Sequence, residues 1–146
     1  MRAIGHIYAG WAMSQDFYRA GLHLTVSGAK NLETYLRTDW EASFARRRAA
    51  NAYAQLVTWY HGDISNNPLY GGDLKRALNA ITARVLLLPS ESDLYFRVAD
   101  NALEREHLAD AELLPIPTIW GHRAGNPVSS PADAAFLKQA VRRWLE

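Results

Sequence analysis

An aspartate and a histidine each follow a short apolar run in the second half of the chain. The run RVLLL ends at Leu88 and Asp93 comes soon after it, while His122 comes just past a second run, ELLPI, residues 112–116. If both runs are parallel strands, their carboxyl ends meet at one edge, where catalytic groups collect in open α/β sheets. There a carboxylate can fix the tautomer of a histidine base. A loop aspartate alone is more often a turn or cap residue, so it is the pairing with His122 that favours chemistry.

The elements that must position this pair are two strands and two helices. RVLLL is typical of a strand buried on both faces, and ELLPI is a weaker second strand. Between them Val98, Ala102 and Leu103 predict a helix of about ten residues, the crossover that a parallel pair needs. After the second strand, Ser130 as N-cap and Pro131 in the first turn predict a C-terminal helix.

The first half of the chain predicts helices only. Apolar residues at helical spacing indicate one helix from the N-terminus to about Gly21, with an apolar face of Ile4, Ile7, Tyr8 and Trp11. Asn31 is predicted to cap a second helix, with an apolar face of Leu32, Tyr35, Leu36, Trp40 and Phe44. A third helix is predicted over residues 51–61, a turn over 65–73, and Asp73 as the cap of a short helix. The aromatic side chains on these helices are expected to fill the core, with the lining of a substrate tunnel as the alternative.

Composition narrows the function classes. The chain has 146 residues, 49% of them hydrophobic and 21% charged, which is typical of one globular domain. A net charge of +1 gives no field that would attract nucleic acid or anionic lipid, and Arg46–Arg48 is expected to be a solvated helix face. The chain has no cysteine, no apolar run of membrane-spanning length and no secretory signal at its N-terminus, so we expect a cytoplasmic protein. His6, His23, His61 and Asp63 lack metal-ligand spacing, and we predict neither metal nor cofactor.

The order of these parts resembles the last third of an α/β-hydrolase-fold protein. Strand, S-x-S-D at residues 90–93, helix, strand, W-G-H at residues 120–122 and an amphipathic C-terminal helix follow one another as in that superfamily. RAIGHIYAGWAMSQDFY and NPLYGGDLKRALNAITARVLLLPSESDLYF resemble its homoserine O-acetyltransferase-like branch. The resemblance implies a mostly helical α/β chain: a helical lid, residues 1–72, then the C-terminal part of the hydrolase core, residues 73–146, with two parallel strands. It also implies that Asp93 is the triad acid and His122 the triad base.

The nucleophile of that superfamily has no counterpart in this sequence. The serine sits in a G-x-S-x-G elbow that precedes the acid and the histidine, and neither Ser14, Ser27, Ser90 nor Ser92 lies in such a motif. We therefore expect the C-terminal portion of a larger enzyme, or the product of a truncated or split gene, which does not complete acyl chemistry alone.

Arg123 is a second departure from the resemblance. In the acetyltransferases an acid follows the histidine, whereas here the sequence is GHRAGNP. This disfavours homoserine as the acceptor and leaves an esterase at least as well supported as an acyltransferase. The expected substrate is a small ester or acyl compound.

A non-catalytic remnant or interaction module is the alternative function. In either case apolar surface from RVLLL and from the C-terminal helix is expected to be exposed. We therefore expect homo-oligomers, or association with a chain that supplies the missing sheet, and no nucleic-acid or membrane partner.

Overall fold

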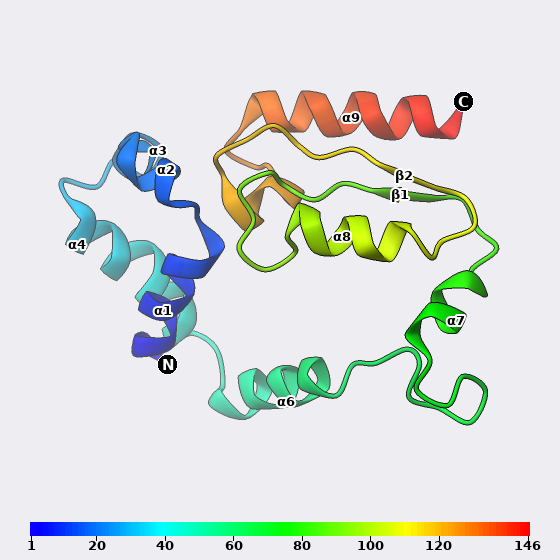
Figure 1. The fold of residues 1–146 in the computed structure, drawn as a ribbon. Coiled ribbons are helices and arrows are strands. Elements are labelled where there is room, and N and C mark those ends of the chain that lie inside the picture. The colour runs from blue at the N-terminus through cyan, green and yellow to red at the C-terminus, as the bar shows by residue number, and fades with distance from the viewer.

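The computed structural model describes residues 1–146 as a mostly helical chain with one small sheet (Figure 1). The strands are β1 (Val85–Leu87) and β2 (Ala111–Leu113). Two short segments of other helix types are the π-helix η1 (Leu36–Glu41) and the 3₁₀-helix η2 (Gly121–Gly125). The α-helices are α1 (Arg2–Ala12), α2 (Gln15–Arg19), α3 (Leu22–Ser27), α4 (Leu32–Tyr35), α5 (Ala42–Ala45), α6 (Ala49–Tyr60), α7 (Leu74–Asn79), α8 (Val98–Arg105) and α9 (Pro131–Leu145).

The two strands pair in parallel, as the sequence predicts. Val85 lies opposite Ala111 and Leu87 opposite Leu113, and a separate parallel bridge joins Ser90 to Ile116 beyond the strand ends. Helix α8 forms the crossover, and the strands lie between α8 and α9 (Figure 1). The prediction that the strands are buried is wrong, because all their residues are only half-buried. In this chain each strand has a neighbour on one side only.

The first half of the chain has its own core, where α1 packs against η1 and α5. Gly5 allows this approach: a Cβ added there would lie 2.8 Å from the carbonyl oxygen of Trp40. The buried apolar residues of this core are Ala9, Ala12, Met13, Phe17, Tyr35, Trp40 and Phe44. Three of the residues predicted for the second helix therefore reach the core.

The predicted first helix is wrong in its length and in its buried face. It ends at Ala12, and Ser14 starts α2 by accepting a hydrogen bond from the Phe17 amide. Helix α1 buries small residues, because the backbone of η1 lies too close for large ones. Three of the four residues expected to face the core are exposed instead, by 42% for Ile4, 65% for Ile7 and 51% for Trp11, whereas Tyr8 is partly buried against the core.

The predicted helix caps are confirmed. The side chains of Asn31, Asp73 and Ser130 each accept a hydrogen bond from the backbone amide three residues further on. Helix α6 also lies where the third helix was predicted, but it buries no residue, so the expected core role of Trp59 and Tyr60 is wrong.

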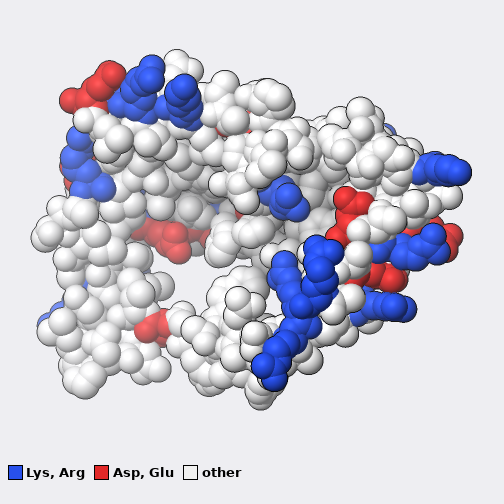
Figure 2. All heavy atoms as spheres, turned by 180° about the vertical axis from the view of Figure 1, so that it is seen from behind, with Lys and Arg blue, Asp and Glu red and all other residues white.

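Most charged side chains lie at the surface, with Asp93 and Asp133 as buried exceptions. Arg46–Arg48 are exposed, and Lys and Arg gather in a strip on a face otherwise formed largely by uncharged residues (Figure 2). None of the helices combines the length and hydropathy that a bilayer-spanning helix needs.

We predict opposite effects for alanine at two glycines of α1. Gly5→Ala is expected to lower the free energy of unfolding by about 1–3 kcal/mol, since its methyl group would press on the Trp40 carbonyl. Gly10→Ala should raise it by up to about 1 kcal/mol, because nothing lies within 4 Å and alanine favours a helix. Urea unfolding of both variants measures this, and equal effects would contradict the close approach of α1 to η1.

The partly buried Tyr18 and the buried Tyr35 predict a loss of stability in alkali. Burial and the neighbouring Tyr35 raise the pKa of Tyr18, and burial also raises the pKa of Tyr35. The folded chain therefore keeps protons that the unfolded chain loses, so this stability is present below about pH 10 and lost as the pH rises further. Unfolding free energies measured from about pH 8 to about pH 11 should fall accordingly.

Tyr18→Phe is the matched variant for this measurement. It removes the 2.8 Å hydrogen bond that the Tyr18 hydroxyl donates to the Ala9 carbonyl, so it should cost about 1 kcal/mol at neutral pH. Its stability should then fall less steeply in alkali. An unchanged slope would show that Tyr18 does not cause the pH dependence.

Candidate functional site

The structure brings Asp93 and His122 into contact at the carboxyl end of the sheet. Nδ1 of His122 lies 3.1 Å from Oδ2 of Asp93, at hydrogen-bonding distance. The carboxylate is buried, with 6% of its side chain exposed, whereas 31% of the imidazole side chain is exposed. No other side chain hydrogen bonds to the imidazole. With Nδ1 engaged by the carboxylate, Nε2 is the nitrogen left to exchange a proton with a reacting group.

The turn after β1 orients the carboxylate. Oδ1 of Asp93 accepts the backbone amides of Tyr95 at 2.7 Å and Phe96 at 3.3 Å, which leaves Oδ2 for His122. These bonds lie within the turn itself, so they do not depend on distant parts of the chain. Aspartate readily forms such local bonds to the backbone, which is why it is common in turns. Asp93 therefore has both the turn role and the contact with a histidine.

The side chain of Ser92 joins the turn that carries Asp93 to the turn that carries His122. Its hydroxyl donates to the Thr118 carbonyl at 2.7 Å and accepts the Gly121 amide at 3.0 Å. The residue before Asp93 is thus bonded to the residue before His122. Sequence reasoning treated Ser92 only as a failed nucleophile, and its place in S-x-S-D next to the acid was the signal for this role.

The backbone that follows helix α1 packs against the turn at Gly121, next to the site. Gly121 has φ +59°, and a Cβ there would lie 2.8 Å from the Ala12 carbonyl oxygen and 2.9 Å from the Ser14 nitrogen. The Ser14 hydroxyl donates to the Ile119 carbonyl at 2.5 Å. Only glycine combines this backbone conformation with so close an approach. The helical half of the chain is therefore fixed against the residue that precedes His122.

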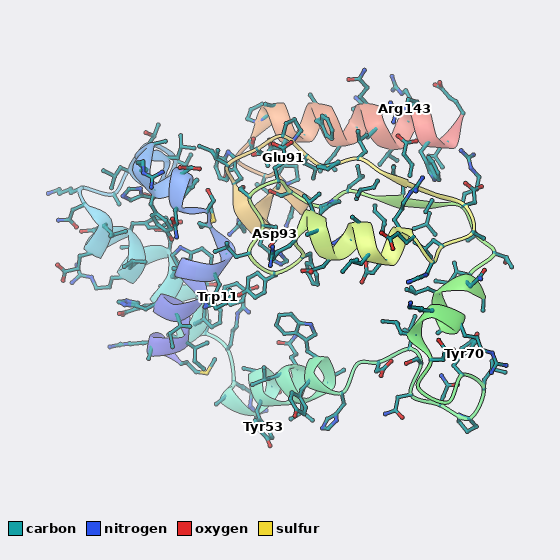
Figure 3. The ribbon with its side chains drawn as sticks, viewed as in Figure 1. Trp11, Tyr53, Tyr70, Glu91, Asp93 and Arg143 are labelled. Carbon is teal, nitrogen blue, oxygen red and sulfur yellow. The ribbon has the colours of Figure 1, made fainter.

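Aromatic rings surround the imidazole. The ring of Tyr95 lies 4.8 Å from that of His122, and the ring of Phe96 lies 5.4 Å from it. Tyr95 in turn contacts Tyr8 and Trp11 of α1 and Trp59 of α6, with centroids 5.7 to 5.8 Å apart. Asp93 lies in the loop before α8, near Trp11 of α1 (Figure 3). Burial raises the pKa of Tyr95, so its hydroxyl is neutral at physiological pH.

The other residues singled out in the sequence do not add a metal ligand or a nucleophile to the pair. Histidine and acidic side chains form no group of three that would hold a metal ion. The hydroxyls of Ser14 and Ser92 donate hydrogen bonds to backbone carbonyls. The hydroxyl oxygen of Ser90 lies 3.3 Å from that of Ser92. Arg123, which follows the histidine, is exposed.

The architecture around this pair is that of the C-terminal part of an α/β-hydrolase fold. The chain superposes on an acetylester hydrolase from Corynebacterium glutamicum with a TM-score of 0.85 and 27% identity, over 95% of this chain and 39% of that one. It matches the fold of the acetyl esterase MekB with a TM-score of 0.87 and 23% identity, over 97% of this chain and 40% of that one.

Curated relatives point to the same class of protein. The chain is 30% identical to an ethyl acetate hydrolase of Pseudomonas veronii over 77% of its own length. It is 28% identical to a probable esterase of Corynebacterium glutamicum over 84% of its length. It spans about a third of these relatives, 31% and 34% of their lengths. No protein-family model matches the chain. The chain is thus similar to a segment of proteins named as esterases, and none of these matches is to a homoserine O-acetyltransferase.

We predict that Asp93 sets the tautomer of His122. Neutral His122 should carry its proton on Nδ1, because the carboxylate only accepts hydrogen bonds. In Asp93→Asn the amide can donate to Nδ1, which should move the proton to Nε2. Nitrogen NMR of histidine-labelled protein distinguishes the two tautomers.

His61 and Ser92 supply the comparisons for this experiment. His61 is exposed and distant in sequence from the pair, so its tautomer should not respond to Asp93→Asn. Ser92→Ala should leave His122 on the Nδ1 tautomer but broaden its signals, because one fastening between the turns is lost. An unchanged His122 tautomer in Asp93→Asn would contradict the orienting role of the carboxylate.

Proposed function

We propose that this chain supplies the acid and the base of a serine ester hydrolase, with Asp93 orienting His122 and His122 acting as general base. The observation that carries the proposal is the 3.1 Å contact between Nδ1 and the buried carboxylate. The similarity to proteins named as esterases supports the same reaction class. The serine nucleophile would come from a G-x-S-x-G elbow, which this sequence does not contain.

In the proposed reaction Nε2 of His122 takes the proton of the serine hydroxyl as the oxygen attacks the ester carbonyl. Asp93 accepts the Nδ1 proton and stabilises the imidazolium that forms. His122 then gives its proton to the leaving alcohol. For hydrolysis a water molecule follows, and His122 activates it in the same way before returning the proton to serine.

Hydrolysis is favoured over transfer to homoserine. The residue after His122 is the exposed Arg123, where the acetyltransferase pattern has an acid to hold the substrate amine. An arginine repels that amine, so water is the better supported acceptor. By the same proposal, residues 1–72 form the lid over the site and residues 73–146 belong to the core.

Self-association without catalysis is the second candidate function. The exposed apolar residues of α6, with Tyr53 70% and Leu56 59% exposed, favour it, because such surface often marks an interface. In that case the Asp93–His122 contact would be structural only. The two functions differ in whether catalysis depends on His122.

The experiment is to supply the serine elbow and the preceding strands as a second polypeptide or as a fusion. Activity toward p-nitrophenyl acetate should then appear, whereas the 146-residue chain alone should be no faster than free imidazole. His122→Ala should lower the restored kcat/KM by about 10²- to 10⁴-fold, and Asp93→Asn should also lower it by orders of magnitude.

His61→Ala is the control, because His61 is exposed and lies outside the site. It should leave the restored activity unchanged. Restored activity that is indifferent to both His122→Ala and Asp93→Asn would overturn the proposal. Robust activity of the chain alone would show that it contains an unrecognised nucleophile.

A further inference from the structure

An apolar pocket lies between α1 and α6 next to the candidate site. Its volume is about 440 Å³, and ten of its twelve lining residues are apolar. Ile4 and Tyr8 line it from α1, Leu56 and Trp59 from α6, and Tyr95 from the loop that carries Asp93. This volume falls in the usual range for small-molecule sites, which are mostly apolar concave surfaces.

Tyr95 connects this pocket to the base. One ring contact of Tyr95 is to Trp59, a lining residue of the pocket, at 5.7 Å, and another is to the His122 imidazole at 4.8 Å. Tyr8 and Phe44 line both this pocket and a neighbouring one of about 360 Å³ that contains His122. A continuous aromatic wall therefore leads from the imidazole to the apolar pocket.

The charge of the lining defines the ligand. The lining contains no acidic residue, and its one charged side chain is that of Arg47, whose guanidinium lies over the Phe44 ring at 4.5 Å. Apart from Arg47 and Gln55, a group bound in this pocket would meet aromatic and aliphatic side chains, which do not compensate a buried charge. The pocket thus suits an uncharged hydrocarbon group.

The exposed side chains of α6 point to the same occupant. Leu56 is 59% and Trp59 56% exposed, although both belong to a concave wall. Burial of their apolar surface by a ligand is favourable, by about 0.8 kcal/mol for each CH₂ group that leaves water. A surface that docks another protein would not need to be connected to His122, whereas this pocket is connected to it through Tyr95.

We infer that the pocket between α1 and α6 binds an alkyl or aryl group of the ester substrate, several carbons long and uncharged. The inference rests on the proposed ester hydrolysis and adds its substrate class: esters with a substantial apolar group rather than the smallest esters alone. Trp59 and Leu56 are its specificity-determining residues, and Tyr95 is the wall shared with the base.

Binding of non-hydrolysable ketones to the 146-residue chain tests the inference without catalysis. The probes are 2-pentanone, 2-heptanone and 2-nonanone, followed by NMR of the ring protons of Trp59 and Tyr95. Affinity should rise about fourfold for each added methylene, which corresponds to about 0.8 kcal/mol, until the pocket is filled. No shift of either ring with any ketone would overturn the inference.

Three substitutions on α6 compare the effect on ketone binding of residues that line the pocket with that of a residue outside it. Trp59→Ala should weaken 2-nonanone binding at least tenfold. Ala52→Phe, which places a ring in the pocket wall, should exclude 2-nonanone while the fold stays intact by circular dichroism. Tyr60→Ala is the matched control, since Tyr60 is 84% exposed and outside the lining, and it should leave binding unchanged. Equal effects of Trp59→Ala and Tyr60→Ala would contradict a specific pocket.

Further measurements test this inference independently of the proposed function and distinguish a substrate from other occupants of the pocket. Asp93→Asn should leave ketone binding unchanged. If the restored esterase depends on His122 but the chain binds no ketone, the inference fails and the proposed function stands. If the chain binds ketones but the restored activity does not depend on His122, the proposed function fails, and with it the assignment of the bound group to an ester. Ring shifts that follow protein concentration instead of ketone would identify a second copy as the occupant and overturn the inference.

The restored esterase then shows which part of the ester enters the pocket. An increase of kcat/KM along ethyl, butyl and hexyl acetate would place the alcohol group there. An increase along the methyl esters of butanoic, hexanoic and octanoic acid would place the acyl group there. A flat profile in both series would contradict the inference.

Discussion

The contact between the turn at Gly121 and the end of α1 fixes the two halves of the chain relative to each other. The backbone of Ala12–Ser14 lies where any side chain on Gly121 would be, and the Ser14 hydroxyl is bonded to the Ile119 carbonyl. Because His122 is the next residue, the packing of α1 also sets where the imidazole stands. The aromatic residues of α1 then reach Tyr95 on the other side of the site. A close backbone approach thus sets the position of both the imidazole and the aromatic side chains around it.

Local signals in the sequence were sufficient for most elements. The caps at Asn31, Asp73 and Ser130 depend on bonds within one helical turn, so residue type and spacing predict them. The parallel strands follow from an apolar run, a helix and a second run. The meeting of Asp93 and His122 follows from the strand ends, because the ends of parallel strands share one edge. Their catalytic role stays a prediction.

The errors arose where long-range packing outweighs periodicity. Helical spacing of Ile4, Ile7 and Trp11 predicted a buried face, but α1 is pressed against η1 by its small residues and turns the large ones outward. The same reasoning assigned Trp59 to the core, whereas it lines a surface pocket. An apolar residue that no helix or strand covers has the same spacing as one in a core. The sequence pattern alone therefore cannot distinguish a substrate wall from an interior.

The two carboxylate oxygens of Asp93 make different contacts: Oδ1 bonds within its own turn, and Oδ2 contacts His122. Oδ1 accepts the amides of its own turn, and Ser92 bonds that turn to the one that carries His122, so the two turns are joined directly as well as through α1. If His122 is the base, preorganisation of this kind removes the cost of orienting it when a substrate binds. In the proposed reaction, only the nucleophile and the groups that stabilise the developing oxyanion remain to be brought to Nε2. The contact between Asp93 and His122 is thus present in this chain without those groups, and so are the aromatic contacts that Tyr95 makes.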